Sequence, residues 1–252
     1  MRRLLPLLCL STLASRGVGF QGAVARGVSR SLSSTTQACA NPPGKGGGAS
    51  ASEPEMTWES MWANGLQPGQ AFDAAKPETA LLALIPGSGV QGLQSSPPLD
   101  LAGKSALVPG CGRGYALAAL SKGGCARVHG LEISQTAVTR ANEYLKGVGV
   151  GKEVTVADGD FFAHAETYDV VYDCTFLCAI PPERREEWAV KMAQLIRPGG
   201  VLVTLIFPVR EGVEPADGQI GGGPPFAMSP KLVEKLLAPK GVFKKTSLEK
   251  VP

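Results

Sequence analysis

From Ser105 onward the sequence alternates short apolar runs with longer stretches whose apolar residues recur at helical spacing. This alternation is typical of a parallel sheet whose connecting helices cover both of its faces. The runs expected to be strands are 105–109 (SALVP), 127–132 (RVHGLE), 153–158 (EVTVAD), 168–173 (YDVVYD), 200–207 (GVLVTLIF) and 242–249 (VFKKTSLE). The chain is therefore expected to be an α/β protein with a doubly wound, mostly parallel sheet.

Two stretches between these runs carry clear helix signals. Ser134 is a suitable N-cap for a helix in which apolar residues follow three or four positions apart. A second helix contains Trp188 and Met192 and is expected to end at the segment RPGG. Pro198 cannot continue that helix, and a glycine after it can adopt a left-handed turn. Ligands of such sheets bind at the carboxyl ends of the strands, so the loops after the first four strands should carry the chemistry.

The first of these loops is rich in glycine. Gly110, Gly112 and Gly114 lie between the first expected strand and the helix that follows it. Glycine lets the backbone turn sharply and approach a ligand, and the N–H groups of the following helix then point at that ligand. A lone GxGxG motif is weak support, because glycine turns also serve plain strand-to-helix connections.

Carboxylates follow the second and third strands. Glu132 ends the second strand and could accept hydrogen bonds from the two hydroxyls of a ribose; the alternative is a solvated carboxylate that caps the Ser134 helix. Asp160 could accept from an adenine amino group while Phe161 flanks the ring, and Asp158 competes for that role. A dinucleotide would favour GxGxxG, so the spacing fits an adenosine with a short amino-acid tail better.

The first 52 residues differ in composition from the remainder. They hold five arginines, one lysine and no acidic residue, which leaves 19 basic against 22 acidic residues in the rest of the chain. An acid-free segment rich in arginine and serine is typical of a mitochondrial or plastid transit peptide, with a secretory signal as the alternative. The remainder has no basic excess that would indicate a nucleic-acid partner.

A linker rich in glycine, proline and serine follows this leader. We therefore assign residues 1–54 to a targeting leader and flexible linker, and residues 55–252 to one domain. The leader's apolar run is too short to span a membrane as a helix. The cysteines lack the paired spacing of a zinc site, so no metal is expected and free thiols in a reducing compartment are favoured.

Several segments in order resemble the thiopurine methyltransferase superfamily, and within it the plant and algal thiol and halide methyltransferases. They are MTWESMWANGLQPGQAFDAAKPETALLAL, ALVPGCGRGYALAAL, GLEIS, GDFF, YDVVYDCTFLCAIPPERREEWAVKM, LIRPGGVLVTLIFPV and GGPPF. The resemblance covers about Met56 to Pro252. It implies the class I fold of methyltransferases that use S-adenosylmethionine (SAM), and methyl transfer to halide, bisulfide or thiocyanate.

The resemblance also implies which residues meet the cofactor. Aromatic residues of the N-terminal segment that pack over SAM match Trp58, Trp62 and Phe72, where plant enzymes usually have tryptophan at the last position. An aromatic face suits the positive sulfonium, although i, i+4 spacing alone would favour core residues. The matching cofactor positions further along are Gly110, Gly112, Glu132, Asp160, Phe161 and Cys174. Cys174 stands where plant enzymes have tyrosine and thiopurine methyltransferases have arginine.

The substrate is expected to be a small anion that needs no general base, because it arrives deprotonated. Alignment and a dry pocket would then supply catalysis. We accordingly assign no catalytic acid or base; His129 lies inside a strand, and His164 follows the phenylalanine pair. The substrate pocket is expected to include Phe207, Pro208 and Phe226, together with the N-terminal aromatic residues and the loop CTFLCAI (174–180). Glycine and proline around Phe226 could also form an inert loop.

Two other functions stay open from the sequence. One is S-methylation of larger aromatic thiols, and the other is a truncated SAM-binding protein without catalysis. Members of the family continue with a further antiparallel strand. We expect this strand to be missing here, which would leave a gap beside the fifth strand. The protein is expected to be a monomer that acts on a small molecule, with neither a nucleic acid nor a membrane as partner.

Overall fold

The computed structural model describes residues 2–9, 57–94, 96–209, 223–238, 243–245 and 247–251. For residues 2–9 and 249–251 it describes the backbone alone. The predicted linker and most of the predicted leader lie outside the described residues, so the boundary at residue 55 stays a prediction.

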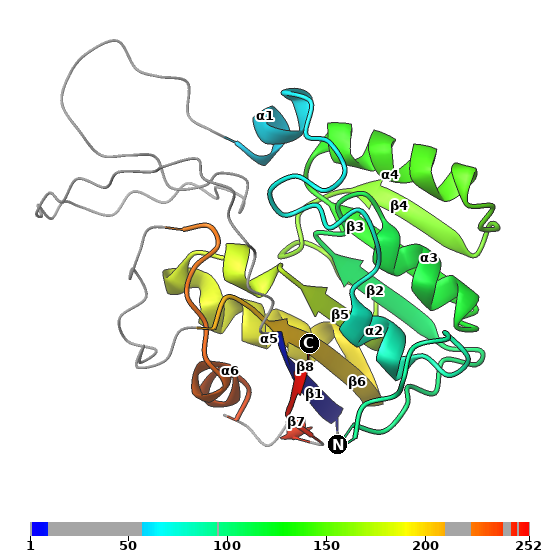
Figure 1. Cartoon of the computed structure of the whole chain (residues 1–252). Coiled ribbons are helices and arrows are strands. Elements are labelled where there is room, and N and C mark those ends of the chain that lie inside the picture. Colours follow the sequence, from blue (N-terminus) through cyan, green and yellow to red (C-terminus); the bar gives the residue numbers. More distant parts are fainter. Residues whose placement is uncertain are drawn as a thin grey trace, which may run out of the picture.

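The described helices lie in the connections between strands (Figure 1). They are α1 (Trp58–Ala63), α2 (Thr79–Leu84), α3 (Tyr115–Lys122), α4 (Gln135–Gly147), α5 (Arg185–Leu195) and α6 (Pro230–Leu237), with the short 3₁₀ turns η1 (Leu177–Ala179) and η2 (Pro182–Arg184). The strands are β1 (Arg2–Cys9), β2 (Ser105–Pro109), β3 (Arg127–Glu132), β4 (Val154–Asp158), β5 (Tyr168–Cys174), β6 (Ile196–Ile206), β7 (Phe243–Lys245) and β8 (Glu249–Val251).

The strands form one sheet in the order β4-β3-β2-β5-β6-β1-β7, and β8 also pairs with β1. All ladders between the described strands are parallel. The order reverses between β2 and β5, and the predicted doubly wound parallel sheet is confirmed. The predicted bounds agree with β2 and β3, and differ by one residue at β4 and β5.

The end of the sheet differs in two details from the expectation. β6 begins at Ile196 and so includes the RPGG segment. The pairing of β5 with β6 shifts in register between Tyr168 and Val170, and this shift accommodates the turn at Gly199, whose φ is 84°. The last expected strand is divided into β7 and β8.

The place beside β6 is filled by β1. Arg2–Cys9 is predicted from the sequence to lie in a leader outside the fold, with a gap beside β6. Instead, its backbone pairs in parallel with residues 201–206 of β6. On its other side β1 pairs with β7 and β8. An interior strand satisfies the backbone N–H and C=O groups that β6 would otherwise expose at an edge.

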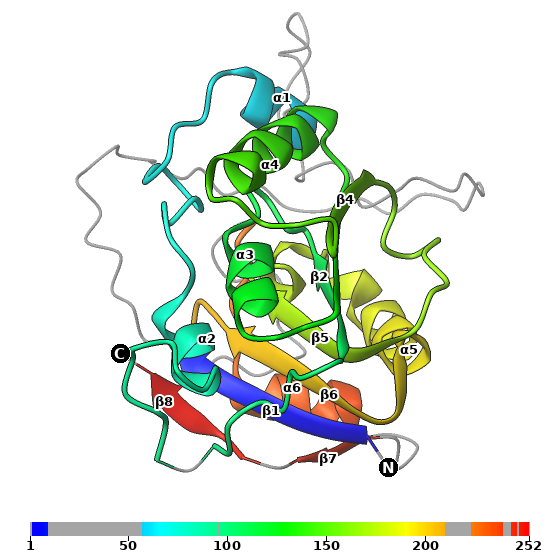
Figure 2. The ribbon, with the colours of Figure 1, turned by 90° about the vertical axis from the view of Figure 1, so that its right-hand side faces the viewer.

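The core has two parts, one on each face of the sheet, because side chains alternate along a strand. In β2, Ala106 and Val108 face the cluster formed with α2, α3 and part of α4, whereas Leu107 faces the cluster formed with α5 and α6. Figure 2 shows the helices on either side of the strands. Within the described part of the chain, no helix reaches the length and apolarity of a membrane span.

The helix caps also follow the sequence. The Ser134 side chain accepts a hydrogen bond from the backbone N–H of Ala137 at 3.1 Å, which confirms Ser134 as the N-cap of α4. Because β2 to β5 are parallel, their carboxyl ends lie at one edge of the sheet, and the loops predicted to carry the chemistry meet there.

Candidate functional site

The turn between β2 and α3 has a backbone conformation that favours glycine. Gly110, Gly112 and Gly114 have φ angles of 57°, 51° and 87°, where a residue with a side chain is strained by about 1–2 kcal/mol. A Cβ on Gly110 would lie 2.7 Å from the Phe176 ring. A Cβ on Gly112 would lie 3.5 Å from the Trp62 ring. The turn therefore needs glycine for its own geometry, and at Gly110 also for the Phe176 ring that covers it.

Glu132 links this turn to the next loop. It is 7% exposed, and its Oε2 accepts a hydrogen bond from the N–H of Gly112 at 3.0 Å. Its Oε1 accepts from the N–H groups of Ile133 at 2.8 Å and Ser134 at 3.2 Å. Burial raises the pKa of Glu132, and the three N–H groups oppose that rise. Three of the about four lone pairs of a carboxylate are thus occupied, and the one that remains, on Oε2, can accept from a hydroxyl of a ribose.

The alternative for Glu132, a solvated carboxylate that caps α4, does not describe this geometry. Glu132 is buried, and α4 is capped by the side chain of Ser134. A second carboxylate, from Glu59 of α1, lies at the start of α4, where it accepts from Ser134 Oγ at 2.6 Å and from the Thr136 N–H at 3.2 Å.

The loop after β4 separates the two candidate base-reading carboxylates. Asp158 is exposed, whereas Asp160 is partly buried. Asp160 Oδ1 accepts from the N–H of Phe162 at 2.9 Å, which holds the turn. The neighbouring Phe161 is 4% exposed, and its ring centroid lies 4.9 Å from that of Phe176. This placement favours Asp160 over Asp158, and its role toward adenine stays a prediction.

The three aromatic residues assigned from the resemblance gather over the glycine turn. Trp58 and Trp62 each meet the Phe72 ring edge to face, with ring centroids 5.7 Å apart in both pairs. Trp62 is 4% exposed and Phe72 is 38% exposed. Figure 1 shows α1, which carries both tryptophans, beside the start of α4. Trp62 is the member that covers Gly112.

Phe176 belongs to the loop 174–180 that was predicted for the substrate wall, but its contact with two predicted cofactor residues was not predicted. The chain reverses after β5 through Thr175, whose φ is 58°, and the Phe176 ring then covers Gly110 and meets Phe161. The signal that could have indicated this contact is a large aromatic residue two positions after the end of β5, at the edge of the sheet where the predicted cofactor residues lie. Its position after a left-handed residue could not be read from the sequence.

Cys174, predicted as a cofactor residue, is the last residue of β5, and the predicted substrate-pocket residues lie directly after β6 and on the segment before α6. Cys174 is partly buried and packs, as Phe207 does, against the core on the α2 and α3 face. Burial raises the pKa of Cys174 well above that of a free thiol. Pro208 follows β6, and Phe226 is 6% exposed, with its N–H donating to the Cys178 carbonyl at 2.7 Å. The assignments of these residues to cofactor or substrate stay predictions.

A buried arginine at the start of α5, also missed from the sequence, contacts the segment that carries Phe226. Arg185 is 3% exposed, and its guanidinium donates to the Ala227 carbonyl at 3.4 Å and lies 5.9 Å from the Phe226 ring centroid. Burial lowers the pKa of Arg185. Among the described residues, no group accepts from its Nε. Phe226 is thus fixed from two sides, by Cys178 and Arg185.

The carboxyl group of Asp173 is buried beneath the loop after β5. It accepts from the Leu177 N–H at 3.1 Å and from Trp188 Nε1 at 3.0 Å. Burial raises the pKa of Asp173 to about 7. Because this value is above that of an exposed aspartate, the folded protein binds a proton that the unfolded chain releases between about pH 4 and 7.

We therefore expect this group's contribution to stability to be greatest in acid and to be lost as the pH rises toward 7. In the wild type, the contribution should fall by roughly 3 kcal/mol between pH 5 and pH 8. Asp173→Asn cannot titrate, so the difference in free energy of unfolding between wild type and variant should shrink over that interval. Urea denaturation at the two pH values measures it, and a constant difference would show that Asp173 does not titrate there.

The two histidines lie away from the glycine turn. Their rings stack with centroids 5.5 Å apart, and His164 Nε2 is 2.9 Å from the hydroxyl of Tyr168, the first residue of β5. His129 Nδ1 is 2.9 Å from Thr155 Oγ1. Burial lowers the pKa of both histidines. In the described part of the chain, no three His, Cys, Asp or Glu side chains are grouped to hold a metal ion.

Comparison with known proteins agrees with the geometry. The model of the thiopurine S-methyltransferase family matches residues 55–251. The chain is 37% identical over 186 residues to "Probable thiol methyltransferase 2" of Arabidopsis thaliana, covering 73% of this chain and 72% of the relative. It is 32% identical over 200 residues to "Thiocyanate methyltransferase 1" of Brassica oleracea, covering 79% and 78%.

A bacterial relative represents the other branch of the resemblance. The chain is 35% identical over 148 residues to "Thiopurine S-methyltransferase" of Vibrio cholerae, covering 51% of this chain and 63% of the relative. The family match and the plant relatives extend over most of the domain that holds the glycine turn and Glu132. The chain belongs to the thiopurine S-methyltransferase family and is a SAM-dependent methyltransferase.

Proposed function

We propose that this methyltransferase transfers the methyl group of SAM to a small anionic nucleophile: thiocyanate, bisulfide or a halide. The observation that carries the proposal is the similarity to plant thiol and thiocyanate methyltransferases over about three quarters of the chain. The aromatic cover of the glycine turn supports it, because aromatic faces stabilise a neighbouring positive charge and exclude water.

The residues at the edge of the sheet fit SAM. Glu132 would hold the ribose, since its carboxylate is buried and has a free lone pair on Oε2 beside the glycine turn. The amino-acid tail would lie along Gly112, where a larger side chain would fill the space under Trp62. Asp160 and Phe161 would contact the base. When bound, SAM supplies an electrophilic methyl group on a positively charged sulfur.

The chain's own contribution to the reaction would be alignment and dehydration. An anionic nucleophile has no proton to lose, so no side chain has to act as a base, and the lone pair that forms the new bond is already available. Phe207, Pro208 and Phe226 would line the path of the anion and strip its water, which raises its reactivity. Trp58, Trp62 and Phe72 would keep the sulfonium side dry and oriented.

Headspace gas chromatography tests this function. The purified full-length protein is incubated with SAM and, in separate reactions, with iodide, bisulfide or thiocyanate. We expect methyl iodide, methanethiol or methyl thiocyanate to form in proportion to protein concentration, and none to form without protein.

An aromatic thiol serves as a competing substrate in the same assay. Methylation of the aromatic thiol, with no product from the three anions, would replace the proposal by the thiopurine-type activity. Binding of S-adenosylhomocysteine (SAH) without turnover of any of these compounds would instead favour the non-catalytic function.

We also propose that the arginine- and serine-rich leader directs the protein to a mitochondrion or plastid. The support is its composition. The pairing of β1 with β6 gives a contrary expectation, because removing the leader would remove β1 from the sheet. Mass spectrometry of the N-terminus in protein isolated from its own cells decides between them. A start between residues 38 and 56 would support cleavage, and an intact N-terminus would contradict it.

We further propose that the protein acts as a monomer on small molecules, with no nucleic acid or membrane partner. The support is the absence of a basic excess after residue 52. Light scattering coupled to size-exclusion chromatography would contradict the monomeric state if it gave twice the chain mass of 26.1 kDa. Sedimentation of the protein together with RNA, DNA or lipid vesicles would contradict the absence of a nucleic-acid or membrane partner.

A further inference from the structure

Residues 57–75 form a strap that runs from α1 across the glycine turn. The strap carries all three aromatic residues of the cover, and Trp62 is its contact with Gly112. It is attached to the domain at two points, each built around a carboxylate. The first is Glu59, which binds the start of α4, and the second is Asp73, which binds the glycine turn itself.

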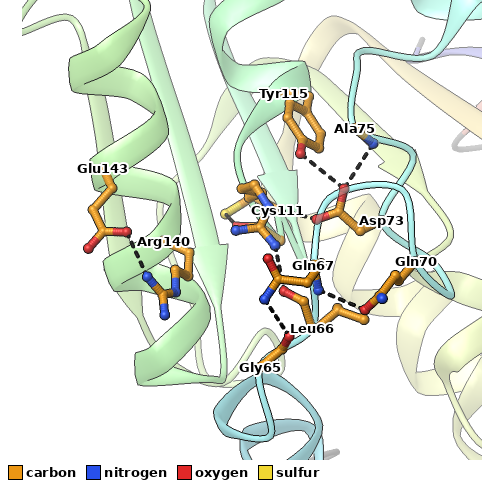
Figure 3. Close-up of polar contacts among 12 residues, drawn as sticks. Gly65, Leu66, Gln67, Gln70, Asp73, Ala75, Cys111, Tyr115, Arg140 and Glu143 are labelled. Carbon is orange, nitrogen blue, oxygen red and sulfur yellow. Dashed lines mark hydrogen bonds and ion pairs between the residues drawn. The ribbon is translucent and has the colours of Figure 1, made fainter.

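The Asp73 carboxylate makes one ion pair and accepts two further hydrogen bonds (Figure 3). Its Oδ2 accepts from Arg113 Nε at 2.7 Å, and its Oδ1 accepts from the Tyr115 hydroxyl at 3.0 Å and from the Ala75 N–H at 2.9 Å. The side chains of Asp73 and Arg113 are 1% and 11% exposed. Burial, followed by the contact with Asp73, raises the pKa of Tyr115 to about 12. The tyrosine therefore keeps its proton and remains a donor.

Arg113 connects Asp73 to the residues that cover the cofactor position. It stands between Gly112 and Gly114 in the turn, and it donates to the Leu66 carbonyl at 2.9 Å. Its guanidinium also lies 5.4 Å from the centroid of the Trp62 ring. One side chain of the turn thus contacts the beginning, middle and end of the strap. The strap cannot lift Trp62 from Gly112 without breaking these contacts or moving the turn.

The two attachments differ in strength. Glu59 is exposed, so water and salt compete with its hydrogen bonds to Ser134 and Thr136. The pair between Asp73 and Arg113 is buried, and removing one member of a buried pair leaves the other charge without compensation. The Asp73 attachment should therefore govern how often the strap opens.

We propose that Asp73 is a positioning residue that closes the strap over SAM through Arg113, and that it thereby controls how fast SAM and SAH leave the site. SAM and SAH share the adenosine and the amino-acid tail, so the strap covers both alike. The Asp73 carboxylate is buried against Arg113, Tyr115 and Ala75, so it would touch neither the cofactor nor the substrate. Its effect should appear in cofactor release and not in the preference among methyl acceptors.

The test compares SAH dissociation from the full-length wild type and from Asp73→Asn, which keeps the size of the side chain but removes its charge. We expect the variant to release SAH faster and to bind it roughly 10-fold more weakly, as the loss of a charge-assisted hydrogen bond implies. Stopped-flow tryptophan fluorescence gives the rate, and calorimetry gives the affinity. Hydrogen exchange should show lower protection in residues 57–75.

Tyr115→Phe is the milder second variant, since it removes one hydrogen bond from Asp73 and leaves the ion pair. It should raise the SAH dissociation rate by about two- to fivefold, and it decides the question if Asp73→Asn does not fold. Glu143→Gln is the matched control, because Glu143 forms an ion pair with Arg140 at 3.1 Å on the surface of α4, with side chains 59% and 50% exposed. It should leave both the rate and the affinity unchanged.

A purely structural role for Asp73 would lower the melting temperature but leave SAH dissociation from the folded variant unchanged, and that result would overturn the proposal. So would a change in the relative rates with iodide and thiocyanate at saturating SAM while SAH release stays constant. Because SAH binding is measured without a methyl acceptor, failure to methylate any anion would refute the proposed function and leave this test intact.

Discussion

Replacing Glu132 by alanine is expected to weaken SAM binding by roughly 10- to 100-fold, because a hydrogen bond to a charged group would be lost at about 1.5–3 kcal/mol. The carboxylate is buried at the end of β3 and accepts from the N–H of Gly112. Alanine would remove the ribose acceptor and leave that N–H without its partner. Isothermal calorimetry with SAH measures the affinity, and methyl product measures the activity.

Two aspartates at the end of β4 provide the comparison for Glu132. Asp158→Asn changes an exposed carboxylate next to the site and should leave SAH affinity within about twofold, since exposed groups contribute little. Asp160→Asn should weaken binding by about 10-fold, the value of one hydrogen bond to the base. If Glu132→Ala binds SAH as the wild type does and is folded by circular dichroism, the cofactor site lies elsewhere.

Most of the sheet could be predicted because its signals are local. The apolar runs at 105–109 and 127–132 are buried strands bounded by turn residues, and the observed strands have the same bounds. Ser134 caps α4 as expected, since an N-cap depends only on residues three positions apart. The position of β1 could not be predicted in this way. Its pairing with β6 joins segments about 200 residues apart, and its sequence is also that of a leader.

The candidate site likewise contains residues that the sequence pattern predicts and residues that it does not. Gly110, Gly112 and Glu132 follow adjacent parallel strands, so the sheet rule brings them together without further knowledge. The aromatic cover could be assigned only through the family resemblance, because helical spacing of tryptophans alone favours a core. The contact of Asp73 with Arg113 was not predicted at all. This contact depends on how residues 57–75 cross the glycine turn, and the spacing of apolar residues in the sequence does not indicate the course of such a segment.

A larger side chain at Gly112 should have an effect comparable to that of the Glu132 change, but for steric reasons. Gly112 has a φ of 51°, and its missing Cβ would already touch the Trp62 ring at 3.5 Å. The methyl groups of valine would extend beyond that Cβ into the ring or into the space proposed for the tail of SAM. We expect Gly112→Val to lose SAH binding in calorimetry by at least about 100-fold, which corresponds to roughly 3 kcal/mol.

Backbone strain alone cannot produce this loss, and a second glycine separates the two causes. Gly149 has a φ of 71°, and a Cβ there would meet nothing within 4 Å, so Gly149→Val has a similar backbone penalty without a steric contact at the site. Both variants should be destabilised by about 1–2 kcal/mol from strain, but only Gly112→Val should lose the cofactor. Gly112→Ala, whose Cβ makes an ordinary contact with Trp62, should fall between them. Equal SAH affinity in all three variants and the wild type would mean that the cofactor does not approach this turn.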